Sequence, residues 1–130
     1  MSPANVWTTY ITLEPAPQSV RQARHFVTEQ LRAHELPDLV EDVGLVTSEL
    51  TTNAVQYADK PVTVRLEGTV QDLRLTVSDD STLAPVPCQP SASDTSGRGL
   101  GIVASISKDW GVVAGMSDVK SVWASFAVLS

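Results

Sequence analysis

The chain contains few cysteine and aromatic residues, and this scarcity limits the kinds of site and core that it can form. Its 130 residues include one cysteine, Cys88, which excludes an internal disulfide and any metal site built from a cysteine cluster. Because Cys88 lies among prolines with no basic neighbour, we expect an ordinary neutral loop thiol. Only 5% of the residues are aromatic, so aliphatic side chains must fill the core.

Basic residues and long apolar runs are also scarce. Fifteen acids against nine lysines and arginines give a formal charge of −6, which repels a phosphate backbone, so nucleic acid is not an expected partner. No apolar run approaches the roughly 20 residues that span a bilayer. The polar start at residues 2–5 gives no sign of a secretory signal. We therefore expect a cytoplasmic protein without membrane contact.

The length and the regular spread of valine and leucine fit a single domain over residues 1–130. Alternating apolar residues predict strands at 6–13, 62–68, about 73–77, 110–114 and 119–128, the second and third forming an antiparallel hairpin. Spacings of three and four predict helices at 19–34, with Ser19 as its N-cap, at 38–58 and at 99–107. The proline-rich connection at 82–96 is interpreted as a lid. This order predicts an α+β two-layer sandwich, with helices on one face of a mixed, mostly antiparallel sheet.

Glu49 and Asn53 are four positions apart on the second predicted helix, so their side chains share a face beside the buried stripe. A carboxylate there can accept a proton from a water or hydroxyl. An amide oxygen suits Mg²⁺, which takes few protein oxygens together with phosphate and water. Taken alone, the spacing favours the plainer alternative of an exposed glutamate and a helix-end asparagine with local hydrogen bonds.

Asp79 continues the alternation of the strand at 73–77 and therefore falls on the face that should be buried. An ionised carboxylate there needs hydrogen-bond donors, and the exocyclic amine of a purine would be one. The alternative is that the strand ends at Ser78 and that residues 79–81 form a polar turn.

The segment Gly97-Arg98-Gly99-Leu100-Gly101 leads into the third predicted helix, whose first N–H groups can bind an anion. Its spacing is neither a dinucleotide fingerprint nor a Walker A motif, because no early strand–helix–strand unit contains it and no Gly-Lys-Ser/Thr follows. A flexible loop that ends in a helix cap is the alternative.

Four other polar or aromatic residues have structural interpretations. Lys120 is interpreted as a charge on an edge strand and Trp123 as a half-buried packing residue. His25 and His34 lie on or beside the polar face of the first predicted helix, where we expect them to be solvated.

Taken together, these segments resemble the GHKL ATPase fold shared by gyrase, mismatch-repair proteins and histidine kinases. The resemblance is closest to the small anti-sigma-factor serine/threonine kinases that consist of this domain alone. Residues 45–55 look like their N-box, 77–81 and 97–103 like their two glycine boxes, and 110–111 and 122–124 like their closing strands. The resemblance covers essentially the whole chain.

The resemblance implies ATP and Mg²⁺ as cofactors. It implies that Asn53 ligates magnesium, that Glu49 activates the acceptor hydroxyl of a protein substrate, and that Asp79 accepts the adenine amino group. The phosphates would be lined by Gly97, Gly99 and Gly101 with Leu100 between them, Arg98 would touch the γ-phosphate, and Ser121 would supply a hydroxyl near adenine. Ser81 and Val119 stand where relatives often have glycine, which bears on nucleotide affinity and turnover rather than on the fold.

The resemblance also implies a role and partners. It implies a kinase that phosphorylates an anti-anti-sigma factor of the STAS type and sequesters a sigma factor, as a homodimer that uses the first strand and its neighbouring helix. The alternative is a nucleotide-gated regulatory binding module without kinase activity, in which ATP biases the 82–96 lid. The catalytic half of a sensor kinase is not expected, because no dimerisation helix pair with a phosphoacceptor histidine precedes the domain.

Overall fold

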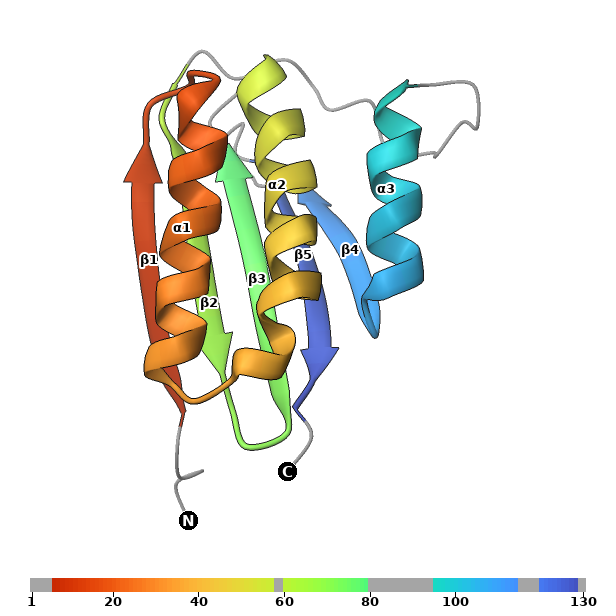
Figure 1. The fold of residues 1–130 in the computed structure, drawn as a ribbon. Helices are drawn as coiled ribbons and strands as arrows, with labels where there is room; N and C mark the ends of the chain where they lie inside the picture. The colour runs from red at the N-terminus through yellow and green to blue at the C-terminus, as the bar shows by residue number, and fades with distance from the viewer. Residues whose placement is uncertain (1–5, 58–59, 80–94, 115–119, 129–130) are drawn as a thin grey trace.

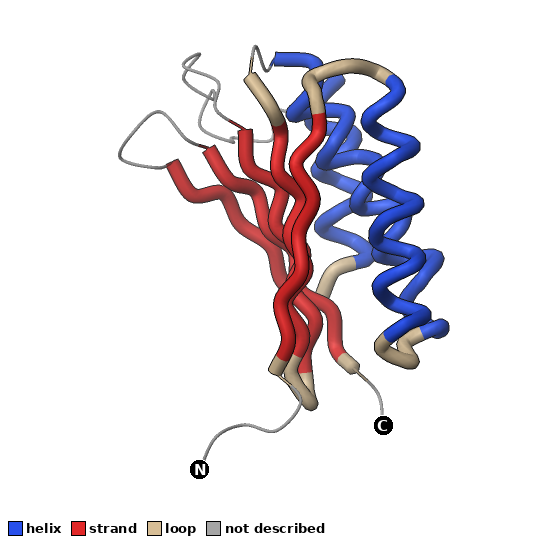
Figure 2. The backbone as a smooth tube through the Cα atoms, turned by 90° about the vertical axis from the view of Figure 1, so that its left-hand side faces the viewer, coloured by secondary structure: helices blue, strands red, loops and turns tan. Residues whose placement is uncertain are grey.

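Five strands form one sheet, and the helices cover one of its faces (Figures 1 and 2). The structure, a computed structural model, describes residues 6–57, 60–79, 95–114 and 120–128. Along the chain the elements are β1 (Trp7–Leu13), α1 (Gln18–Ala33), the 3₁₀ helix η1 (Pro37–Leu39), α2 (Val40–Tyr57), β2 (Val62–Gly68), β3 (Asp72–Asp79), α3 (Thr95–Ile106), β4 (Asp109–Ala114) and β5 (Lys120–Ala127). Most of the expected lid, as well as Ser81, Cys88 and Val119, lies outside the described residues.

The strand order is β1-β2-β3-β5-β4, and each of the four pairings is antiparallel. The predicted α+β sandwich and the β2–β3 hairpin are confirmed. The last strand, β5, inserts between β3 and β4 instead of lying outside them. The interpretation of Lys120 as an edge-strand charge is therefore wrong, because β5 has a neighbour on both sides.

The core lies between the helices and the sheet, where the apolar periodicities of the two layers meet. Alternate residues of β2 and β3 face the helices, and Val64, Leu66 and Leu75 are fully buried. The helices present stripes with a spacing of three and four, in which Val27 and Leu31 of α1 are fully buried. The expected core faces are thus confirmed.

Two helix starts differ from the prediction. Ser19 is not an N-cap: Pro17 holds that position without a side-chain hydrogen bond, and the buried Ser19 donates its hydroxyl to the carbonyl oxygen of Glu14. Helix α3 begins at Thr95 rather than at Gly99, so it contains the glycine segment. The packing of α3 on α2 outweighs the helix penalty of about 1 kcal/mol for each glycine.

Two tryptophans lie on glycines of the neighbouring strand. Trp7 pairs in register with Gly68 on the helix-covered face, and its ring stacks on His34 with the ring centroids 3.6 Å apart. His34 is therefore exposed but not simply solvated. Trp123 pairs with Gly111 on the bare face, where the Arg74 guanidinium lies 4.2 Å from its ring centroid. The predicted half-burial of Trp123 is confirmed.

Candidate functional site

Helix α2 lies between α1 and α3 (Figure 1) and contacts both of them. Ser48 faces α1, because its hydroxyl accepts a hydrogen bond from Arg24. At about 100° per residue, Glu49 and Asn53 lie about 100° and 140° around the axis from Ser48. This rotation turns them to the flank of α2 that faces α3.

Glu49 and Asn53 are both half-buried. The alternative of a fully exposed glutamate is wrong, and Asn53 is not at the helix end, because α2 continues to Tyr57. One turn of helix separates the carboxylate from the amide, a rise of about 6 Å. The pair therefore forms a polar strip at the boundary between the core and the α2–α3 side of the molecule.

Asp79 is the last residue of β3 and pairs in register with Lys120 of β5. The strand thus continues past Ser78, so the alternative of a turn that begins at residue 79 is wrong. The end of β3 lies at the same end of the molecule as the C-terminal turns of α2 (Figure 1). The topology therefore places residue 79 at the same end of the domain as the C-terminal part of α2, which contains Asn53.

The glycine segment enters this arrangement from α3, whose first turn lies at the same end of the molecule (Figure 1). In a helix that begins at Thr95, the N–H groups of residues 95–97, including that of Gly97, have no intrahelical acceptor. The amides of Gly99 and Gly101 fall within the helix, where they bond to the carbonyl four residues earlier. The anion-binding end is therefore at 95–97, and the expectation that the glycines precede the helix is wrong.

Ser121 is not brought together with Glu49 and Asn53. Its Oγ lies 2.8 Å from the Oγ of Ser78, its partner in register on β3. Val122, the next residue of β5, packs against the core beneath the helices, so Ser121 lies on the bare face of the sheet. The alternation of Val122, Ala124 and Phe126 carried this information in the sequence.

A family model for the histidine kinase-like ATPase domain matches residues 13–123. The chain belongs to this family. The matched span runs from the last residue of β1 into β5 and contains each of the elements that form the site. The chain is therefore an ATP-binding module of the GHKL type. A search of the curated proteins found no match to the chain.

Histidine kinase-like ATPase domains bind and use ATP, usually with Mg²⁺, and the polar strip on α2 fits this ion. Within the described residues there is no cluster of three or more histidine, cysteine or carboxylate side chains that could hold a metal by itself. Mg²⁺ needs no such cluster, because phosphate and water complete its octahedron around one or two protein oxygens. The amide oxygen of Asn53 is of the required chemistry, with the carboxylate of Glu49 one turn away.

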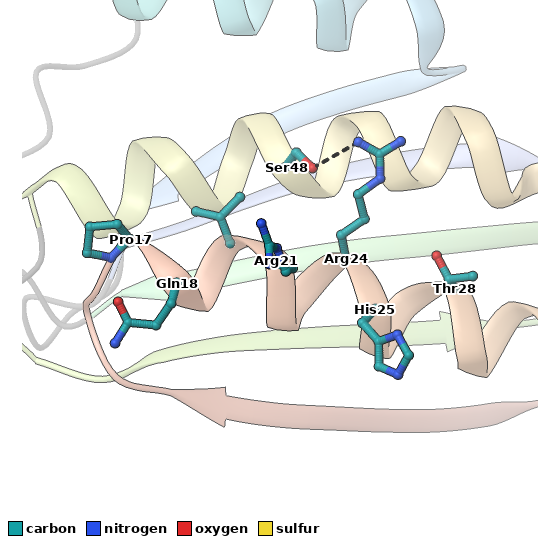
Figure 3. A pocket seen from close by; sticks show the side chains of 8 residues that line it. Pro17, Gln18, Arg21, Arg24, His25, Thr28 and Ser48 are labelled. Carbon is teal, nitrogen blue, oxygen red and sulfur yellow. Dashed lines mark hydrogen bonds between the residues drawn. The ribbon is translucent and has the colours of Figure 1, made fainter.

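An open groove of about 900 Å³ lies between α1 and α2, and none of the sequence motifs predicts it (Figure 3). Arg24 crosses it, with Nη1 3.4 Å from the Ser48 hydroxyl. Gly44 makes room for this arginine, because a Cβ at that position would lie 3.1 Å from its Nε. Arg21 also lines the groove, and neither arginine forms an ion pair within the described residues.

The sequence held one sign of this groove, since two arginines three positions apart share a helix face in an acidic chain. His25 lines the groove too and is paired with Glu29 at 3.1 Å on the exposed side of α1. In the part of the chain that the structure describes, no helix has the length and apolarity to cross a membrane.

Proposed function

We propose that this GHKL module is a serine/threonine protein kinase that phosphorylates an anti-anti-sigma factor of the STAS type and sequesters a sigma factor. The observation that carries the proposal is the pair on α2. Glu49 and Asn53 are half-buried, one turn apart and turned toward α3, so a base and a magnesium ligand lie side by side.

Each residue of the pair has a distinct task. Asn53 would hold Mg²⁺ through its amide oxygen, and the ion would supply neutralisation of the phosphate charge. Glu49 accepts the proton of the substrate serine hydroxyl. The serine oxygen then forms a bond to the γ-phosphorus, the bond to the bridging oxygen breaks, and ADP leaves. Catalysis of this kind depends mainly on positioning, and a continuous helix holds both side chains on one rigid element.

The remaining contacts come from the elements at the same end of the fold. We assign the acceptor for the adenine amine to Asp79, at the end of β3. The phosphates lie at the N-terminal turn of α3, where Gly97 supplies an amide without an intrahelical acceptor. This placement uses the start of the helix rather than a glycine loop before it.

Two surfaces are proposed for partners. The groove between α1 and α2 presents Arg21 and Arg24 in a chain of charge −6, which suits an acidic segment of a partner protein. β1 is an edge strand on which Tyr10 is 62% exposed, and it is the contact that we propose for the homodimer.

A second candidate function is supported by the helical state of the glycine segment. The amides of Gly99 and Gly101 are used within α3, so they are not available to the phosphates in this conformation. A module that binds ATP, changes its affinity for a partner and does not transfer phosphate would need only the nucleotide contacts.

The test is phosphoryl transfer from γ-labelled ATP with Mg²⁺ to the cognate anti-anti-sigma factor, beside calorimetry of ATP binding. Glu49→Gln keeps the size of the side chain, so it should retain ATP binding and lose roughly 100-fold or more of the transfer rate. Glu29→Gln, an exposed change on α1, is the control and should leave both measurements unchanged.

Three outcomes separate the candidates. Label on the substrate that depends on Glu49 supports the kinase. ATP binding without labelled substrate, together with ATP-dependent capture of the sigma factor, supports the binding module. If the wild-type protein does not bind ATP or ADP, both candidates are wrong.

A further inference from the structure

A second groove, which we call the η1–α3 groove, lies at the opposite end of the domain from Asp79 (Figure 1). It has a volume of about 380 Å³ and is formed where η1 and the start of α2 meet the end of α3 and the end of β5. Asp42, which lines it, is about 16 Å from Asn53 along the axis of α2. The groove is thus separate from the nucleotide contacts.

The floor of the η1–α3 groove is apolar. Phe126, only 3% exposed, closes its base. Leu36, Leu39 and Ile106 line it and remain half-buried, although they pack against the core. Apolar side chains left partly exposed in a concave site gain from further burial, so the floor suits the apolar side chains of a ligand.

The rim of the groove is acidic. Glu35, Asp38 and Asp42 are exposed, and none of these carboxylates forms an ion pair with another described residue. Lys108 also lines the groove, but its Nζ forms an ion pair with Oδ1 of Asp72 at a distance of 2.8 Å. The three rim carboxylates therefore face a ligand without a neutralising cation.

Glu35 occupies a position at which its own side chain costs stability. It follows the end of α1 with a φ of 61°, in the left-handed region where glycine is the usual residue. The Leu36 N–H donates to the carbonyl oxygen of Leu31, with an N···O distance of 2.7 Å, and the Glu35 N–H donates to the carbonyl oxygen of Arg32. These two bonds form the Schellman pattern of a helix end. The chain thus keeps a carboxylate on the rim where a glycine would be more stable.

The groove lining also contains a buried hydroxyl. Ser107 Oγ is shielded from solvent and has no hydrogen-bond partner among the described residues. A polar group in this state gains from any ligand that brings a donor or an acceptor to it.

We propose that the η1–α3 groove binds an amphipathic helix of a partner protein, one that presents apolar side chains flanked by lysine or arginine. The apolar floor takes the apolar face of the helix, and the rim carboxylates pair with its cations. This surface is separate from the arginine-lined groove between α1 and α2, and its charge is opposite. The two grooves therefore select partners of opposite charge, and the inference does not depend on nucleotide binding.

The test uses two synthetic peptides of about 18 residues, a length that supports an amphipathic helix. Both carry leucines at spacings of three and four, and they differ only in arginine or glutamate at the flanking positions. Titration of the ¹⁵N-labelled full chain should move the amide signals of Leu36, Leu39 and Ile106 with the arginine peptide. The glutamate peptide should bind about 10-fold more weakly or worse, since three rim pairs each contribute a factor of up to about 5.

Glu35→Gly gives the sharpest variant, because stability and binding should change in opposite directions. The midpoint of urea denaturation should rise as the left-handed strain is relieved, while the arginine peptide binds about two- to five-fold more weakly. Asp38→Asn and Asp42→Asn should weaken binding by similar factors. Glu29→Gln, an exposed acid outside the groove, should not change it.

The proposal is overturned if the two peptides bind equally, if neither binds, or if the affected amides lie on the bare face of the sheet or in the α1–α2 groove. It is also overturned if the rim variants bind the arginine peptide as tightly as the wild type does. ATP binding is measured separately, so these results are distinguishable from a failure of the proposed kinase.

Discussion

Replacement of Gly68 by alanine should destabilise the fold by trapping a new methyl group against an aromatic ring. The Cβ would overlap Cε2 and Nε1 of Trp7, which lies across this glycine. To move away from the new methyl group, the ring must displace the imidazole of His34, which stacks on it at a centroid distance of 3.6 Å and an interplanar angle of 3°. The substitution therefore forces Trp7 out from between α1 and β2.

The magnitude follows from two losses. Overpacking a filled site costs about 1–3 kcal/mol. Displacement of the ring also forfeits its stacking on His34, worth about 0.5–1.5 kcal/mol for an aromatic pair. We expect Gly68→Ala to lower the free energy of unfolding by about 1.5–4.5 kcal/mol, a large share of the total for a domain of this size.

Urea denaturation followed by circular dichroism measures the change. Gly101→Ala is the matched control, because no atom of the described residues lies within 4 Å of a Cβ at that helical position, and it should raise the free energy of unfolding by about 0.5–1 kcal/mol. In a Trp7→Ala background the added methyl has no ring to meet, so Gly68→Ala should then cost less than about 0.5 kcal/mol. An equal loss with and without the indole would refute the reasoning.

Two further changes test the packing. Thr51→Val should raise the free energy of unfolding by about 1–2 kcal/mol in the same denaturation assay, because Thr51 is fully buried and its hydroxyl has no hydrogen-bond partner among the residues that the structure describes. A loss of stability would show that the hydroxyl is in use. Gly111→Ala would place a Cβ 2.8 Å from Nε1 of Trp123 and push the ring from its place beside Arg74, so it should cost about 1–3 kcal/mol and alter tryptophan fluorescence; an unchanged spectrum would contradict this.

The sequence predicted the layers of the fold because each layer follows a local periodicity. The alternation at Val62, Val64 and Leu66 and the stripe through Val27 and Leu31 are properties of single segments, and the structure buries these residues. The order of the strands is not such a property. Nothing within residues 120–127 indicates that β5 lies between β3 and β4, since that depends on which neighbours the whole sheet provides.

The predicted starts of α1 and α3 are wrong because tertiary contacts outweigh the local preferences of the sequence. Ser19 has the chemistry of an N-cap, but its hydroxyl is used by the turn that leaves β1. The glycines at 97–101 are poor helix formers, and α3 nonetheless includes them because it packs on α2. Local helix propensity alone predicts neither the role of Ser19 nor the start of α3.

For the site, the spacing of Glu49 and Asn53 on a helix was sufficient to place them on one face. The bare-face position of Ser121 was available from strand parity and was missed. The reach of Arg24 to Ser48 could not be predicted, because it requires Gly44 on another helix to leave space for the guanidinium.

The order of the strands also determines which parts of the sheet form early. β2–β3 and β4–β5 are hairpins that close over short connections, whereas β1–β2 and β3–β5 join segments separated by long stretches of chain. Closing a long stretch of chain costs conformational entropy before any stabilising contacts form. We therefore expect the two hairpins to form before β3 pairs with β5. Asp79 pairs with Lys120 of β5, and a nucleotide bound at Asp79, as we propose, would stabilise only the fully assembled sheet.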